Sequence, residues 1–159
     1  RREICSRFRI NFGCQVLAYS RTVKNVAGVQ YIDLDTLLSA CDIVSVHLPQ
    51  NASTVGLLSR EKIALMKKSA LLINTARGPI VDNRALAEAL NAGEIGGAGI
   101  DVFDMEPPLP TDYPLLHPPN TVLTPHIGFV THEAMGKRTA IVFDNIAKWL
   151  GGAPQNVVS

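Results

Sequence analysis

The sequence predicts an α/β fold built on a doubly wound parallel sheet. Short apolar runs of strand length alternate with stretches in which apolar residues recur at helical spacing. This alternation is typical of βαβ crossovers, which place successive strands parallel in one sheet. The runs are apolar at nearly every position, so we expect helices on both faces of the sheet. With 159 residues, the chain is long enough for one domain with a hydrophobic core.

Apolar runs bounded by turn residues are the predicted strands. Pro49 ends one of them, because proline cannot donate to a strand ladder. The predicted strands are residues 14–20, 42–49, 70–76, 97–103 and 120–125.

The predicted helices follow residues that favour a helix N-terminus. Asp33, Ser59 and Asp82 stand at these starts, and Gly93 is expected at the end of the third helix. The predicted helices are 33–40, 59–68, 83–93 and roughly 131–150, the last closed by Gly151-Gly152 and with Phe143, Ile146, Ala147 and Leu150 on one face.

The N-terminal residues also have helical spacing. Ile4, Phe8 and Phe12 share a helical face, and Gly13 is expected to end it. A doubly wound sheet usually opens with a strand and a G-x-G-x-x-G loop, and this sequence contains no such loop. We expect both upstream of Arg1, with strands near 16–19 and 43–46 facing each other across an unfilled lane. The alternative is a smaller α/β domain with no dinucleotide role.

Composition excludes several classes of function. The chain is 47% hydrophobic and 18% charged, with a formal net charge of +1, so no basic excess indicates nucleic acid or a membrane surface. No apolar segment is long enough to span a bilayer. Its three cysteines lack metal-ligand spacing, and we expect a reduced, cytoplasmic setting and no metal.

Three ionisable residues each follow a predicted strand. They are Arg77, Asp101 and His126, and ligands of such sheets bind at the carboxyl ends of the strands. Each also has an ordinary explanation: Arg77 could reach solvent or a nearby aspartate, Asp101 could cap a turn, and a lone histidine is often structural. Because all three are expected at the same edge of the sheet, they indicate a ligand-binding site there.

Several segments resemble one enzyme family. "NTARGPIVD", "AGIDVFDMEP" and "LTPHIG" resemble, in order and spacing, the signature segments of the D-isomer-specific 2-hydroxyacid dehydrogenases. "VLAYSR" and "DIVSVHLP" are similar to the second strand and the cofactor-contacting strand of that family. The resemblance implies an N-terminally truncated Rossmann-type NAD(P)-binding domain over residues 1–152. Residues 153–159 would begin the return to an absent substrate domain.

The resemblance also implies catalytic roles. Arg77 would bind the carboxylate and carbonyl oxygen of a 2-oxo acid, for which its fork of donors is suited. His126 would be the acid in reduction and the base in oxidation, and Glu106 would be its partner carboxylate.

Further residues are implied to contact NAD or NADP, although turn chemistry alone would also explain the proline and glycine among them. NAD-preferring domains carry an acid after the second strand, where this sequence has Ser20 and Arg21. That difference slightly favours NADP, unless Arg21 is a solvated charge or stacks on adenine. The remaining predicted cofactor contacts are Leu48, Pro49, Thr54, Thr75, Ala76, Asp101 and Gly128.

The leading hypothesis is hydride transfer between NAD(P)H and a small 2-oxo acid in a homodimeric intact protein. "EPPLPTDYPLL" somewhat resembles the glycerate dehydrogenase and hydroxypyruvate reductase branch, and the 3-phosphoglycerate branch is the nearest rival. The alternatives are a dinucleotide-binding corepressor-like protein and an inactive cofactor-binding fragment.

Overall fold

The computed structural model describes residues 12–157. The chain divides into two compact units, residues 1–126 and residues 127–159. Most of the predicted N-terminal helix, including Ile4 and Phe8, lies outside the described residues. Within the described part, no helix combines the length and the apolar character that crossing a membrane requires.

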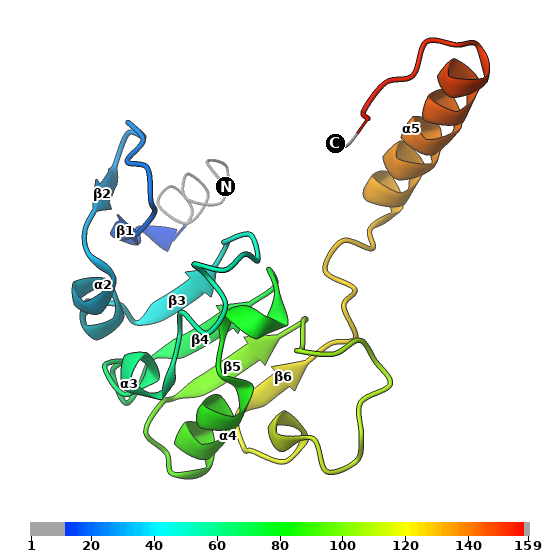
Figure 1. Ribbon diagram of the computed structural model, residues 1–159. Helices are drawn as coiled ribbons and strands as arrows, with labels where there is room; N and C mark the ends of the chain where they lie inside the picture. Colours follow the sequence, from blue (N-terminus) through cyan, green and yellow to red (C-terminus); the bar gives the residue numbers. More distant parts are fainter. Residues whose placement is uncertain (1–11, 158–159) are drawn as a thin grey trace. The chain divides into compact units, whose positions relative to one another are not determined.

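Parallel strands form the first unit, as predicted (Figure 1). Each predicted run contains a strand, but the hydrogen-bonded ladder covers only part of the run. A four-stranded sheet has the order β3 (Ile43–Val46), β4 (Leu71–Asn74), β5 (Gly97–Ile100) and β6 (Thr121–Leu123), and a second sheet pairs β1 (Val16–Ala18) with β2 (Val29–Tyr31).

We predicted an unfilled strand position between the strands near 16–19 and 43–46. The division into two sheets agrees with this prediction, because β1 and β3 do not pair with each other. The doubly wound order places one strand at this position, and residues 12–157 do not supply it. Strand β2 was not predicted. It contains only Val-Gln-Tyr, too short to show an alternating pattern, and its pairing with β1 defines it.

Helices α2 (Leu34–Ala40) and α4 (Asn83–Asn91) have the predicted caps. Asp33 accepts a hydrogen bond from the Thr36 amide at 2.9 Å, and Asp82 accepts one from the Ala85 amide at 2.9 Å. Beyond α4, Gly93 has φ +64° and donates to the Leu90 carbonyl. The following amide donates to Ala89, which completes a Schellman turn.

Helix α3 is much shorter than the predicted 59–68, because it spans only Arg60–Ile63. The Ser59 hydroxyl donates to the Glu61 carboxylate at 2.6 Å and makes no capping bond to the backbone. The Met66 amide then bonds the Ile63 carbonyl, three residues back. This tighter turn ends the helix and leads the chain into β4.

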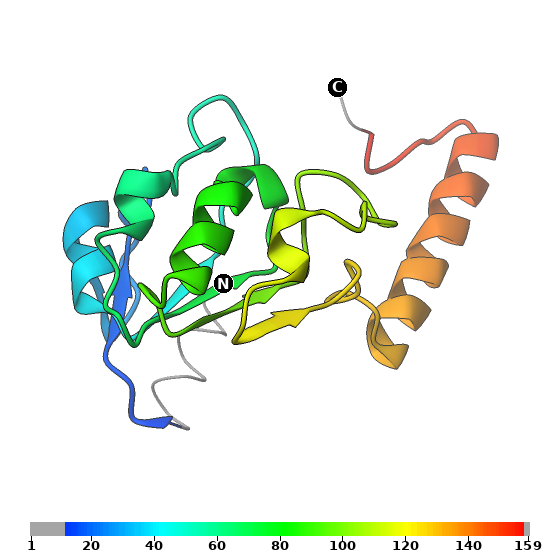
Figure 2. The same cartoon turned by 90° about the horizontal axis from the view of Figure 1, so that it is seen from below.

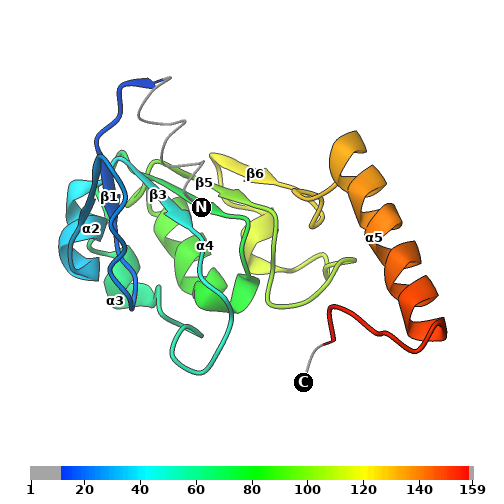
Figure 3. The same ribbon diagram turned by 90° about the horizontal axis from the view of Figure 1, so that it is seen from above.

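The helices of the first unit lie on one face of the four-stranded sheet (Figures 2 and 3). On that face, Val44, Leu72 and Ile100 meet side chains from α3, α4 and the 3₁₀ turn η2 (Pro114–Leu116) in the core. The other face leaves Ile43, Leu71 and Val122 between 40% and 69% exposed. Among the described residues, the helices of the first unit therefore cover the face that carries Val44, Leu72 and Ile100.

The second unit consists mainly of α5 (His132–Leu150), close to the predicted 131–150. Thr131 caps its start by accepting from the Ala134 amide at 3.1 Å, and Gly151 follows its last turn. The predicted apolar face exists, but no side chain of α5 is buried within the described residues, and Phe143, Ile146 and Leu150 are exposed.

Candidate active site

A buried amide shapes the turn that follows β4. Asn74 is 0% exposed; its Nδ2 donates to the Arg77 carbonyl at 3.0 Å, and its Oδ1 accepts from the Ala76 amide at 3.1 Å. These two bonds fix the backbone that carries Arg77. Sequence reasoning missed Asn74. The available signal was an amide at the end of an apolar strand, where it can bond the turn ahead.

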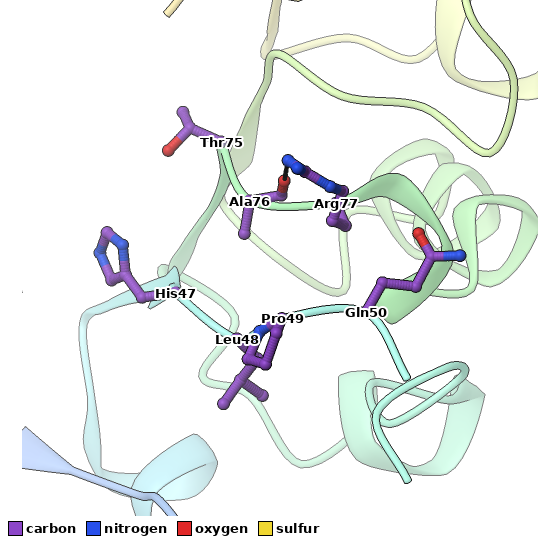
Figure 4. A pocket seen from close by; sticks show the side chains of 7 residues that line it. All are labelled: His47, Leu48, Pro49, Gln50, Thr75, Ala76 and Arg77. Carbon is purple, nitrogen blue, oxygen red and sulfur yellow. Dashed lines mark hydrogen bonds between the residues drawn. The ribbon is translucent and has the colours of Figure 1, made fainter. Parts of the chain in front are cut away.

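Arg77 leaves this turn with an exposed side chain, just before the 3₁₀ turn η1 (Gly78–Ile80). Its Nη1 donates to the Ala76 carbonyl at 2.6 Å, so the guanidinium folds back toward its own turn (Figure 4). A carbonyl accepts a hydrogen bond without neutralising the cation. The group therefore retains the charge and the additional donors needed for an anionic ligand.

A pocket of about 480 Å³ opens at the carboxyl ends of β3 and β4 (Figure 4). The segments that follow the two strands each supply part of its wall. Sequence reasoning missed His47 and Gln50, and the other lining residues were predicted: Leu48, Pro49, Thr75, Ala76 and Arg77.

His47 is two residues beyond Ser45, and their side chains meet, with Nε2 2.9 Å from the serine hydroxyl. Alternation along the predicted strand 42–49 was the available signal, because residues two apart share a face of a strand. His47 places an imidazole in the pocket that contains Arg77.

The pocket's chemistry fits a nicotinamide ring. Leu48, Pro49 and Ala76 provide apolar contact surface, whereas Thr75 and His47 add polar groups. A wall that combines apolar surface with several polar groups suits a flat heteroaromatic ring that carries an amide.

Three further predicted cofactor residues, Thr54, Ser20 and Arg21, lie elsewhere on the first unit. Thr54 is 8% exposed, and its hydroxyl donates to the Pro49 carbonyl at 2.7 Å and accepts from the Asn51 amide at 2.9 Å, so it holds the loop after β3. Beyond β1, the Ser20 hydroxyl donates to the Thr22 carbonyl at 2.7 Å, and Arg21 is exposed.

Asp101 connects the ends of neighbouring strands. It is 4% exposed and accepts from the Thr124 hydroxyl at 2.6 Å, while its amide donates to the Asn74 carbonyl at 3.0 Å. The last residue of β4 and the residues that follow β5 and β6 are therefore bonded in a row along one edge of the sheet. Thr124 was not predicted, because its partner is far away in the sequence.

Glu106 and His126 meet, as the family resemblance implied. His126 Nδ1 is 3.2 Å from each oxygen of the Glu106 carboxylate, and the side chains are 32% and 78% exposed, respectively. His126 has φ 56°, an uncommon backbone conformation for a residue with a side chain, and its amide donates to the Thr124 carbonyl. A carboxylate at Nδ1 orients the imidazole ring.

Gly128, the last predicted contact, belongs to the second unit. It lies in a turn in which the Val130 amide donates to the Ile127 carbonyl at 2.8 Å.

Residues 2–128 match the family model described as "D-isomer specific 2-hydroxyacid dehydrogenase, NAD binding domain". Glyoxylate/hydroxypyruvate reductase B of Yersinia pestis (strain Pestoides F) is 42% identical over 153 residues, covering 94% of this chain and 47% of that protein. The chain spans about half the length of the curated relatives it matches.

Solved structures give the same relationship. A D-isomer specific 2-hydroxyacid dehydrogenase from Lactobacillus delbrueckii ssp. bulgaricus, in its NAD complexed form, is 34% identical with a TM-score of 0.86, covering 99% of this chain and 52% of that one. An acyclic imino acid reductase in complex with NADPH and D-arginine is also 34% identical, with a TM-score of 0.84, covering 99% and 49%.

Proposed function

The chain belongs to the D-isomer-specific 2-hydroxyacid dehydrogenase family, and we propose that it is the dinucleotide-binding part of a longer enzyme that reduces a small 2-oxo acid. In this proposal residues 1–152 form the NAD(P)-binding domain, and residues 153–159 begin the return to a substrate domain. The chain length relative to its relatives supports this division, because the chain covers only 47% of the first of them.

The Glu106–His126 pair carries the proposal. The imidazole has its Nδ1 3.2 Å from a carboxylate and follows β6 at the edge of the sheet where Arg77 follows β4. A carboxylate-oriented imidazole and a strand-end guanidinium at one edge are the groups that reduction of a 2-oxo acid needs.

In this proposal, Arg77 and His126 have different roles in the reaction. Arg77 binds the substrate carboxylate through its fork of donors and stabilises the negative charge that develops on the carbonyl oxygen. His126 gives its proton to that oxygen, and Glu106 orients the ring and stabilises the imidazolium before transfer. Leu48 and Ala76 would form part of the wall that holds a nicotinamide dinucleotide, which would supply the hydride when bound.

We favour glyoxylate or hydroxypyruvate as substrate, because the Yersinia pestis relative carries that name. The test is NADH and NADPH consumption by the proposed full-length enzyme with glyoxylate, hydroxypyruvate, pyruvate and a phosphorylated 3-carbon 2-oxo acid. Preference for the phosphorylated acid would favour the 3-phosphoglycerate branch. No turnover of any 2-oxo acid would contradict the enzyme proposal and leave the corepressor-like or inactive alternatives.

We further propose that NADP(H) is preferred, because Ser20 and Arg21 stand where an acid would repel a 2′-phosphate. Arg21→Ala should raise the Kd for NADPH about 10-fold, the usual size of a charge-assisted contact to phosphate, and change the Kd for NADH less than about twofold. Fluorescence titration of the proposed full-length enzyme measures both constants.

Lys24→Ala is the matched control, because it removes a cation from the same exposed segment. Equal weakening of NADPH and NADH by Arg21→Ala would show that Arg21 does not read the 2′-phosphate.

A further inference from the structure

We infer that Tyr113 is a positioning residue. It holds residues 101–106, which we call the Glu106 loop, and thereby fixes the geometry of the Glu106–His126 pair. The inference rests on the proposed function of that pair. It identifies a residue outside the reacting groups whose hydroxyl controls their geometry.

The hydroxyl of Tyr113 ties the Glu106 loop to α4. It donates to Asp104 Oδ1 at 2.6 Å and accepts from Asn83 Nδ2 at 2.9 Å. Tyr113 is 5% exposed and Asn83 is 6% exposed, at the first position of α4. Burial and the bond to Asp104 both raise the pKa of Tyr113, so the hydroxyl remains a donor at neutral pH.

The Tyr113 ring holds the same segment from its side. It meets the Phe103 ring edge-to-face, with centroids 5.7 Å apart and planes at 89°. On the backbone, Phe103 and Asp104 lie directly against Gly78, where an added Cβ would come within 1.8 Å of the Phe103 carbonyl oxygen. The segment just before Glu106 is therefore held by both Tyr113 and the turn after Arg77.

Glu106 needs this support because its own side chain is 78% exposed. An exposed carboxylate has few packing contacts to fix its rotamer, so its backbone must supply the position. Asp104 is only two residues earlier in the chain, so a more mobile backbone at Asp104 makes the position of Glu106 more mobile as well. Loss of the Tyr113 hydroxyl should leave the fold in place and loosen the carboxylate from His126.

Tyr113→Phe tests the inference with two measurements. In the proposed full-length enzyme, kcat for the best 2-oxo acid should fall about 3- to 10-fold, the effect of one hydrogen bond, with KM changed less than about twofold. We expect kcat to change more than KM because His126 acts in the chemical step, whereas Arg77 binds the substrate carboxylate.

The second measurement is the tautomer of the His126 ring, read from its ¹⁵N shifts in the 159-residue chain at a pH where the ring is neutral. Glu106 at Nδ1 favours the tautomer with the proton on Nδ1. Tyr113→Phe should reduce the fraction of that tautomer. Glu106→Gln gives the reference fraction expected when the carboxylate charge is lost completely. The spectrum of His126→Asn assigns the signal.

Variants of Asp104 separate positioning from folding, because this side chain is exposed and its replacement spares the core. Asp104→Ala removes the acceptor and should reproduce Tyr113→Phe. Asp104→Asn keeps an Oδ1 acceptor and should stay close to the unmodified protein in both measurements. Tyr19→Phe, at an exposed tyrosine near β1, is the control for the loss of a hydroxyl.

The outcomes distinguish the two proposals. A changed tautomer in Tyr113→Phe and Asp104→Ala, in a protein that turns over no 2-oxo acid, would support the positioning role and contradict the proposed function. Turnover with an unchanged tautomer and unchanged kcat in both variants would overturn the positioning role. A rise in KM alone would overturn it as well.

Discussion

Arg77→Ala is expected to lower kcat/KM for the 2-oxo acid by about 10²–10⁴-fold, more than any other single substitution in the site. One group is proposed to do two things: it binds the substrate carboxylate, and it stabilises the charge on the carbonyl oxygen. Alanine removes both, so KM should rise while kcat falls. Steady-state kinetics of the proposed full-length enzyme measure the two effects separately.

Arg77→Lys is the informative control. Lysine keeps the positive charge but loses the planar fork that binds a carboxylate with two parallel hydrogen bonds. It should therefore recover part of the loss in kcat and less of the loss in KM. Among residues 12–157, the guanidinium bonds only a carbonyl of its own turn, so its removal should not unpair a buried acid. Near-normal kcat/KM in Arg77→Ala would remove Arg77 from the mechanism.

Those elements of the fold that depend on local chemistry could be predicted. Asp33 and Asp82 cap their helices because a short carboxylate can reach the third amide ahead, which is a property of four consecutive residues. The end of α4 at Gly93 is equally local. Strand β2 and the early end of α3 depend on pairing and on the path of the chain into the sheet, and neither leaves a local signal.

In the candidate site, too, features that follow from local rules could be predicted, and those that depend on distant contacts could not. Parallel strands bring their carboxyl ends to one edge, and this rule alone located Arg77, Asp101 and His126. The residues that shape the site were missed because they work across the sequence: Thr124 bonds Asp101, and Tyr113 bonds Asn83, 30 positions earlier. A pattern search examines neighbours, whereas these contacts exist only after the sheet has formed.

Gly78→Ala is expected to have the largest effect on stability. The added Cβ would lie 1.8 Å from the Phe103 carbonyl oxygen and 2.6 Å from the Asp104 amide nitrogen. Both are backbone atoms, so no rotamer change relieves the collision. Overpacking of this kind costs about 3 kcal/mol or more, which lowers the melting temperature by roughly 6–12 °C in a chain of this size.

Gly136→Ala, in the interior of α5, is the matched control for this substitution, because nothing lies within 4 Å of its added Cβ. There the same change should stabilise by about 0.5–1 kcal/mol, since alanine favours a helix more than glycine does. Thermal unfolding of the two variants should therefore shift in opposite directions. Because the Phe103–Asp104 segment leads into Glu106, Gly78→Ala should also reduce the Nδ1-protonated fraction of the His126 ring. An unchanged melting temperature in Gly78→Ala would mean that this segment does not rest on Gly78, and the link between the turn after Arg77 and the Glu106 loop would be lost with it.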